Sequence, residues 1–113
     1  MTKDSAADTV AGASFTKREE RLLALLGPGV EGLVRATLRS REGRVQILEG
    51  MFSEALPEAG APVVARQLVA LWSLLWGRGT RAERASWVEY RTQLEELCSA
   101  SGVSMEVYLQ ELG

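Results

Sequence analysis

The side chains that most often carry catalysis are scarce in this sequence. Its 113 residues include no histidine and one cysteine, Cys98, and the only aspartates are Asp4 and Asp8. Histidine is the usual general base near neutral pH and the commonest metal ligand. Ser–His and Cys–His pairs are therefore impossible within the chain, and the thiolate pairs that bind zinc are missing. We expect no catalytic, cofactor-binding or metal site, and no enzyme activity.

Adjacent glutamates are the remaining candidates for acid–base chemistry. Glu19 precedes Glu20, and Glu95 precedes Glu96. Neighbouring residues on a helix point about 100° apart, so the members of each pair diverge instead of facing one reacting group. We interpret both pairs as solvated charges at helix surfaces.

Tryptophan and arginine, the residues that dominate the energetics of protein interfaces, gather around one glycine-containing helix junction. The candidate partner-binding residues are Trp76, Arg78, Arg81, Arg84 and Trp87. This composition predicts a surface that binds another protein, or a second copy of the chain as a homodimer. The alternative interpretation is that the tryptophans pack in the core and the arginines are merely solvated.

A second group of arginines could contact phosphates. It comprises Arg35, Arg39, Arg41 and Arg44, and the first two lie four residues apart on one helical face. Nucleic acid is therefore the alternative partner. The formal net charge of −2 argues against indiscriminate binding to nucleic acid or to anionic membranes, but it leaves a local basic patch open.

The segment 63–76 is the most informative of the elements that would position these residues. On a helix its apolar side chains span an arc of about 160°, whereas an ordinary surface helix needs roughly 100°. Such a helix requires more than one neighbour, and we predict that Leu68, Trp72 and Leu75 are core residues. Its excess apolar surface is either the centre of a small bundle or part of an interface with another chain.

Start and stop signals divide the rest of the chain into further helices. Thr16 with Glu19, and Thr80 with Glu83, match the capping box. Glycines weaken a single helix over 30–56, so we favour a break between residues 40 and 43, with Ser40 as the cap of the following helix. The predicted helices cover residues 17–26, 30–40, 43–56, 63–76, 80–100 and 105–112.

No stretch alternates apolar and polar residues over the length of a strand. We predict an all-α fold, a compact bundle of five to six short helices. Residues 15–113 form the single domain, and residues 1–14, which are small and polar, form a disordered tail. Neither a secretory signal nor a run of 18 apolar residues is present, so a cytoplasmic protein without membrane contact is expected.

The function that these observations favour is a non-enzymatic protein–protein interaction module. It would serve as a small subunit, adaptor, chaperone or inhibitor of a larger bacterial or phage assembly, because histidine, metal motifs and nucleotide-binding motifs are absent and the segment 63–76 has excess apolar surface. The alternative is a nucleic-acid-binding accessory protein, such as a small helical ribonucleoprotein subunit or a transcription regulator.

Overall fold

The computed structural model describes residues 15–54 and 61–113, and this part of the chain consists of seven helices without a strand. The helices are α2 (Lys17–Ala24), α3 (Pro28–Thr37), α4 (Arg41–Glu54), α5 (Pro62–Arg78), α6 (Arg81–Ser86), α7 (Val88–Ala100) and α8 (Met105–Leu112). The predicted all-α class is confirmed. The predicted tail, residues 1–14, and most of the loop before α5 lie outside the described residues.

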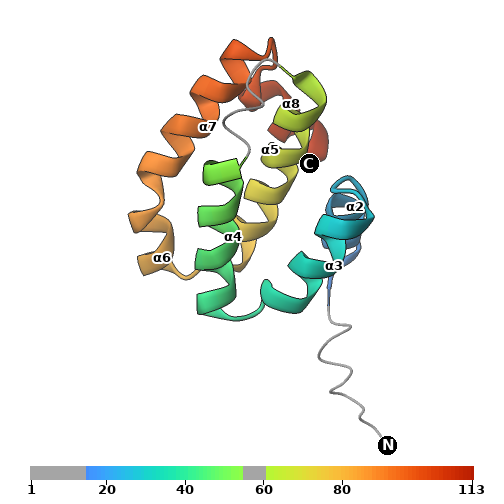
Figure 1. Ribbon diagram of the computed structural model, residues 1–113, viewed down its shortest axis with the longest axis vertical. Helices are drawn as coiled ribbons and strands as arrows, with labels where there is room; N and C mark the ends of the chain where they lie inside the picture. Colours follow the sequence, from blue (N-terminus) through green and yellow to red (C-terminus); the bar gives the residue numbers. More distant parts are fainter. Residues whose placement is uncertain (1–14, 55–60) are drawn as a thin grey trace, which may run out of the picture.

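Helix α5 is the centre of the bundle. It lies between α2, α7 and α8 (Figure 1), and every residue from 68 to 75 is buried. Leu68, Trp72 and Leu75 are 8%, 2% and 0% exposed, so the prediction that they are core residues is confirmed. The wide apolar arc of this helix is therefore covered by neighbours within the same chain.

The two predicted capping boxes are both present at the starts of their helices. Thr16 Oγ1 accepts from the Glu19 amide at 3.0 Å, and Thr80 Oγ1 accepts from the Glu83 amide at 3.2 Å. Both glutamates complete the capping box by accepting the amide of their threonine. Each box satisfies two amides that the first helical turn leaves without partners.

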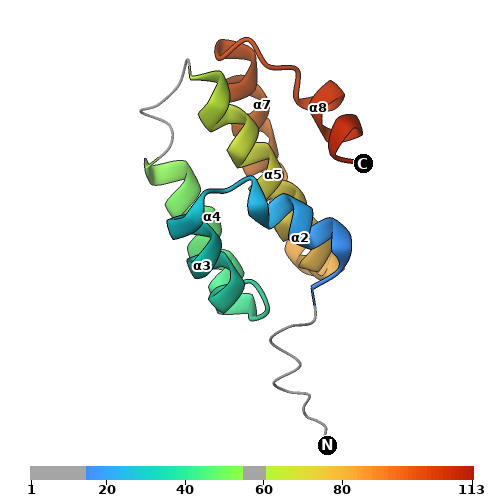
Figure 2. The same cartoon turned by 90° about the vertical axis from the view of Figure 1, so that its right-hand side faces the viewer.

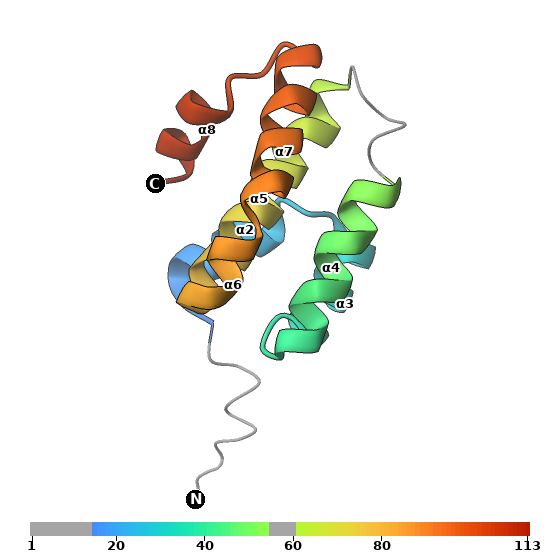
Figure 3. The same cartoon turned by 90° about the vertical axis from the view of Figure 1, so that its left-hand side faces the viewer.

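The predicted break near residue 40 separates α3 from α4, which form an antiparallel hairpin beside α5 (Figures 2 and 3). Ser40 Oγ accepts from the Gly43 amide at 2.9 Å and so caps α4, as expected. The tight turn requires the glycine, because a Cβ at position 43 would overlap the carbonyl oxygen of Thr37. The hairpin therefore has a fixed geometry.

One predicted helix, 80–100, is two helices. Trp87 interrupts it with φ −96° and ψ 5°, between α6 and α7, and its amide donates to the Arg84 carbonyl in a tighter turn. The Trp87 ring is buried and lies edge-on to Trp72, with 6.3 Å between ring centroids. Apolar periodicity is the same on both sides of such a tighter turn, so it could not reveal the break.

The last two helices are joined as the sequence predicts. Gly102, at φ 75°, follows the end of α7, and Ser104 Oγ caps α8 by accepting from the Val107 amide at 3.3 Å. No helix within residues 15–54 and 61–113 is long and apolar enough to cross a membrane.

Candidate functional site

The tryptophans of the 76–87 junction pack against one another. Trp72 and Trp76 are stacked with 5.6 Å between centroids, and Trp87 lies 6.4 Å from Trp76. Arg84 covers the half-buried Trp76 ring at 5.3 Å and donates to the Trp76 carbonyl at 2.8 Å. Because Trp87 is only 3% exposed, its placement in a binding surface differs from the structure, where its ring belongs to the core.

Arg78 is also engaged within the chain. Its Nε donates to Glu19 Oε2 at 2.7 Å and its Nη2 to Glu19 Oε1 at 2.9 Å, and its guanidinium lies over the Phe15 ring. Hydrogen bonding from Arg78 lowers the pKa of Glu19 below its ordinary value, and the same bonds raise the pKa of Arg78. Of the five candidate residues, only Arg81 is classed as exposed, and it has no ion pair with a described residue.

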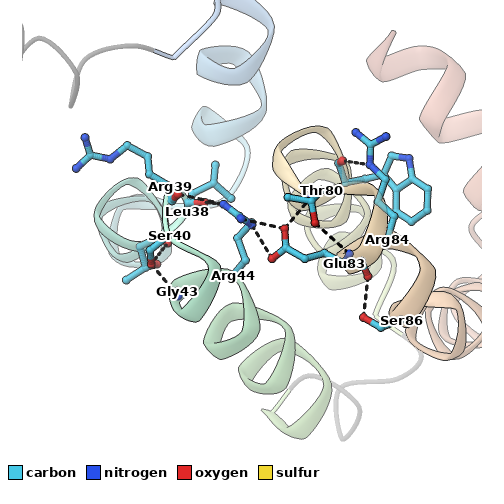
Figure 4. A network of polar contacts seen from close by, with 11 residues as sticks. Leu38, Arg39, Ser40, Gly43, Arg44, Thr80, Glu83, Arg84 and Ser86 are labelled. Atoms are coloured by element: carbon cyan, nitrogen blue, oxygen red, sulfur yellow. Dashed lines mark hydrogen bonds and ion pairs between the residues drawn. The ribbon is translucent and has the colours of Figure 1, made fainter.

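The second arginine group is divided between the interior and the surface. Arg44 is buried and makes a bidentate pair with Glu83 of α6, at 2.9 and 3.3 Å (Figure 4). It also donates to the carbonyls of Leu38 and Arg39, at the end of α3. Burial alone would raise the pKa of Glu83, but its hydrogen bonds with Arg44 and Thr80 outweigh burial and lower it. The hydrogen bonds of Arg44 therefore connect α4 to α6 and to the end of α3, and its guanidinium is not free to bind a phosphate.

Arg35 is held by two carboxylates. It donates to Glu31 at 2.9 Å and to Glu20 of α2 at 3.1 Å, and these bonds raise its pKa further. Glu19 and Glu20 thus diverge as the sequence predicts, toward α5 and α3, but both are ion-paired instead of merely solvated. Within this group, Arg39 and Arg41 are left exposed at the turn between α3 and α4.

An apolar groove lies between α3, α4 and α5, away from both sets of sequence candidates. It encloses about 380 Å³. Except for Gln46 and Gly50, its lining is entirely apolar and consists of Val30, Leu33, Val34, Ile47, Met51, Val64, Leu68 and Leu71. Leu33 and Val30, on α3, are 62% and 47% exposed, so the groove opens onto an apolar helix surface.

The exposed residues of α3 are all small or apolar. They are Pro28, Gly29, Val30, Gly32, Leu33 and Ala36, and we name the last five the α3 face. The side chains of Arg35 and Glu31, on the same helix, are 35% and 30% exposed. Figure 2 shows α3 on the outside of the bundle, in front of α4. In the sequence, Val30 and Leu33 form one apolar stripe with Val34 and Leu38. The structure buries Val34 and Leu38 and leaves Val30 and Leu33 exposed.

The described residues offer little for covalent or metal chemistry. No group of three or more histidine, cysteine, aspartate or glutamate side chains among them could hold a metal ion. Cys98 is fully buried, and burial raises the pKa of its thiol, which disfavours the reactive thiolate. The groove and the α3 face are therefore the features that call for a functional explanation.

The chain matches no protein-family model, no curated protein and no solved structure.

Proposed function

We propose that this chain is a cytoplasmic, non-enzymatic protein–protein interaction module, which acts as a small subunit, adaptor, chaperone or inhibitor of a larger assembly. The groove between α3, α4 and α5, together with the α3 face, is its binding surface. The observation that carries this proposal is the exposure of Leu33 and Val30 beside an apolar groove of about 380 Å³.

Exposure of the apolar α3 face and groove to water is unfavourable in free energy. Burying it would contribute roughly 25 cal/mol for each Å² removed from solvent, and exposed apolar patches often mark sites of protein interaction. A helix that projects apolar side chains at intervals of three and four residues fits a groove of this kind.

A small-molecule ligand fits this groove less well. Pockets for small molecules use a few convergent polar groups to fix the orientation of the ligand. Among the residues that line the groove, Gln46 has the only polar side chain, and the groove is open along α3. Apolar side chains from a protein partner need no such orienting groups.

The binding surface that we propose differs from the 76–87 junction that the sequence predicts. Trp87 is in the core, Arg78 pairs with Glu19, and Arg84 packs on Trp76, so these residues stabilise the fold. Among the five candidates of the junction, only Arg81 has an exposed side chain, as a binding surface there would require.

Capture experiments from the native host test the proposal with two matched variants. Leu33→Glu places a charge at the groove, and Val88→Glu places the same charge on a valine of α7 that is 59% exposed. We expect wild type and Val88→Glu to retain one partner that Leu33→Glu loses, with all three proteins giving the same circular dichroism melt. If Leu33→Glu retains every partner, the groove is not the binding surface.

Nucleic acid remains the second candidate because of one observation. The Arg44–Glu83 pair joins the turn between α3 and α4 to the start of α6, so exposed Arg39, Arg41 and Arg81 gather at one end of the bundle (Figure 1). Arg41 also lines a cavity of about 200 Å³ against α6.

A salt titration with labelled RNA and DNA tests this second candidate. Binding through phosphates must weaken steeply as salt rises, and it must weaken further in Arg39→Gln plus Arg41→Gln. If the affinity for RNA and DNA does not change with salt, or is the same in the double variant, Arg39 and Arg41 do not contact the phosphates.

A further inference from the structure

We propose that a cavity between α5, α7 and α8 binds a small organic carboxylate whose carbon part is flat and apolar. These three helices pack against one another (Figure 1). The cavity measures about 170 Å³, and its lining residues are Trp72, Ser73 and Trp76 of α5, Arg91 of α7 and Leu109 of α8. On α5 the groove is lined by other residues, Val64, Leu68 and Leu71, so the cavity is a separate site that does not depend on the proposed function.

The hydroxyl of Ser73 is the first group that points to a ligand. Ser73 is 8% exposed, and its Oγ accepts from Nη2 of Arg18, on α2, at 2.7 Å. A serine within a helix often donates its own proton to a carbonyl of the preceding turn, but Ser73 donates to no described residue. A buried donor without a partner is unfavourable, and this one lines a cavity, so we expect the cavity to receive an acceptor oxygen.

The arginines around the cavity favour a negatively charged acceptor. Arg91 lines the cavity, and its ion pair with Glu95 is long, at 3.6 Å, with both side chains about half exposed. Arg84 lies over the Trp76 ring, 5.3 Å from its centroid, and has no ion pair within residues 15–54 and 61–113. Arg18 likewise has no carboxylate partner in the part of the chain that the structure describes. Of these three guanidinium groups only one is partly neutralised, so an anion in the cavity is attracted by a net positive charge.

A carboxylate fits these donors better than a doubly charged group does. One of its oxygens can accept from the Ser73 hydroxyl, and the other from the guanidinium of Arg91, because both residues line the same cavity. The charge of Arg91 is already shared with Glu95. A second negative charge on the ligand would therefore be repelled by Glu95 without a further cation in the lining to balance it.

The apolar lining determines the rest of the ligand. Trp72, Trp76 and Leu109 supply two indole rings and an aliphatic side chain, against which a flat apolar group can pack. The volume of about 170 Å³ corresponds to roughly five or six water molecules, which is too small for a drug-sized ligand. The cavity therefore suits a carboxylate on a single ring. Unlike the groove, it offers the convergent polar groups that orient a small molecule.

Titration of the full chain with benzoate, followed by ¹H–¹⁵N NMR, tests this site. We expect saturable shifts of the Ser73 amide and the Trp76 indole N–H, with a Kd of roughly 0.1 to 10 mM for a ligand of so few atoms. Benzyl alcohol has the ring without the charge and should bind at least about fivefold more weakly. Phenyl phosphate, which is largely doubly charged above about pH 7, should also bind more weakly than benzoate.

Two variants remove the donors of the cavity one at a time. Ser73→Ala removes the hydroxyl and should raise the Kd for benzoate at least about fivefold, and Arg91→Gln should do the same by removing the charge. Ser99→Ala and Arg81→Gln change the same residue types at exposed positions outside the cavity and should bind like wild type. Because Ser73→Ala also removes the partner of Arg18, Arg91→Gln provides the test if the serine variant is unstable.

Shifts that rise linearly with benzoate, or that spread evenly over the surface, would overturn the proposal. A Kd that neither Ser73→Ala nor Arg91→Gln changes would overturn it as well. If phenyl phosphate binds more tightly than benzoate, the assignment to a carboxylate is wrong. The capture experiment with Leu33→Glu reports on the groove alone, so the failure of either proposal leaves the other to be judged by its own measurement.

Discussion

The 76–87 junction and the α3 face differ in what they contain and in where their side chains go. The junction holds the tryptophans and arginines that favour binding, yet Trp87 is buried, Arg78 pairs with Glu19, and Arg84 packs on Trp76. The α3 face holds only small and aliphatic residues, and it is open to solvent. Residue type therefore indicates a binding surface only where the fold leaves the residue exposed.

The largest contrast should appear when one side chain is removed from each region. Trp87→Ala should lower the free energy of unfolding by roughly 3–5 kcal/mol, because it deletes a buried ring from the tryptophan cluster. Leu33→Ala should change it by less than about 0.5 kcal/mol, as is usual for exposed positions. Urea unfolding of dilute protein measures both. Equal losses would mean that Leu33 is as much a core residue as Trp87.

The buried ion pair should give the next largest effect. Glu83→Gln keeps the capping box but leaves Arg44 with an uncompensated charge in the interior, so we expect a loss of about 3 kcal/mol. The exposed pair of Arg91 and Glu95 is the control, and Glu95→Gln should have little effect. If both changes cost the same, Arg44 is more hydrated than its burial indicates.

Low pH should remove the stability that the Arg44–Glu83 ion pair contributes. The folded pKa of Glu83 is lowered below its ordinary value, so the stability it contributes is present above about pH 4.3 and is lost as pH falls through the folded pKa. The difference between wild type and Glu83→Gln should therefore shrink below pH 4 in unfolding titrations. A difference that stays constant down to pH 2 would show that the charge of Glu83 is not what matters.

Two glycines of the hairpin provide a smaller and opposite pair of effects. Gly43→Ala should destabilise by roughly 1–3 kcal/mol, because its Cβ overlaps the Thr37 carbonyl at the turn. Gly32→Ala should stabilise the dilute protein by up to about 1 kcal/mol, since alanine favours a helix and meets nothing at this position. Thermal melts measure both changes, and a lower melting temperature for Gly32→Ala would show that the α3 face is not open.

The smallest effect should come from Arg81, the one exposed candidate at the junction. Arg81→Glu should change stability by less than about 0.5 kcal/mol, because the residue has no ion-pair partner among the described residues and a carboxylate is favourable in the first turn of α6. Arg78→Glu should destabilise more, since it replaces the partner of Glu19 with a like charge. A matching melt for the two variants would contradict the role assigned to the Arg78–Glu19 pair.

Local signals in the sequence predicted the helices well. Thr16 with Glu19, Thr80 with Glu83, Ser40 before Gly43 and Ser104 after Gly102 all act over three or four residues, so a linear pattern contains the whole interaction. The central helix was also predictable, because an apolar arc as wide as that of residues 63–76 can only be buried on several sides.

The candidate site was not predictable in the same way. Val30, Leu33, Val34 and Leu38 have similar side chains and one periodicity, yet the first two are exposed and the last two are buried. The sequence shows that one side of the helix over residues 28–37 has no charged residue. Only the contact between Arg35 and Glu20 of α2 shows which side of that helix faces the bundle.

The sequence by itself determined the all-α class, the caps and the need of α5 for more than one neighbour, because each depends on neighbouring residues or on total apolar surface. Only the tertiary structure decided which arginines are neutralised and which apolar residues remain in water. Arg44 meets Glu83 across 39 positions of the chain, and Arg78 meets Glu19 across 59. Such pairings depend on how helices distant in sequence pack, and that packing leaves the α3 face uncovered.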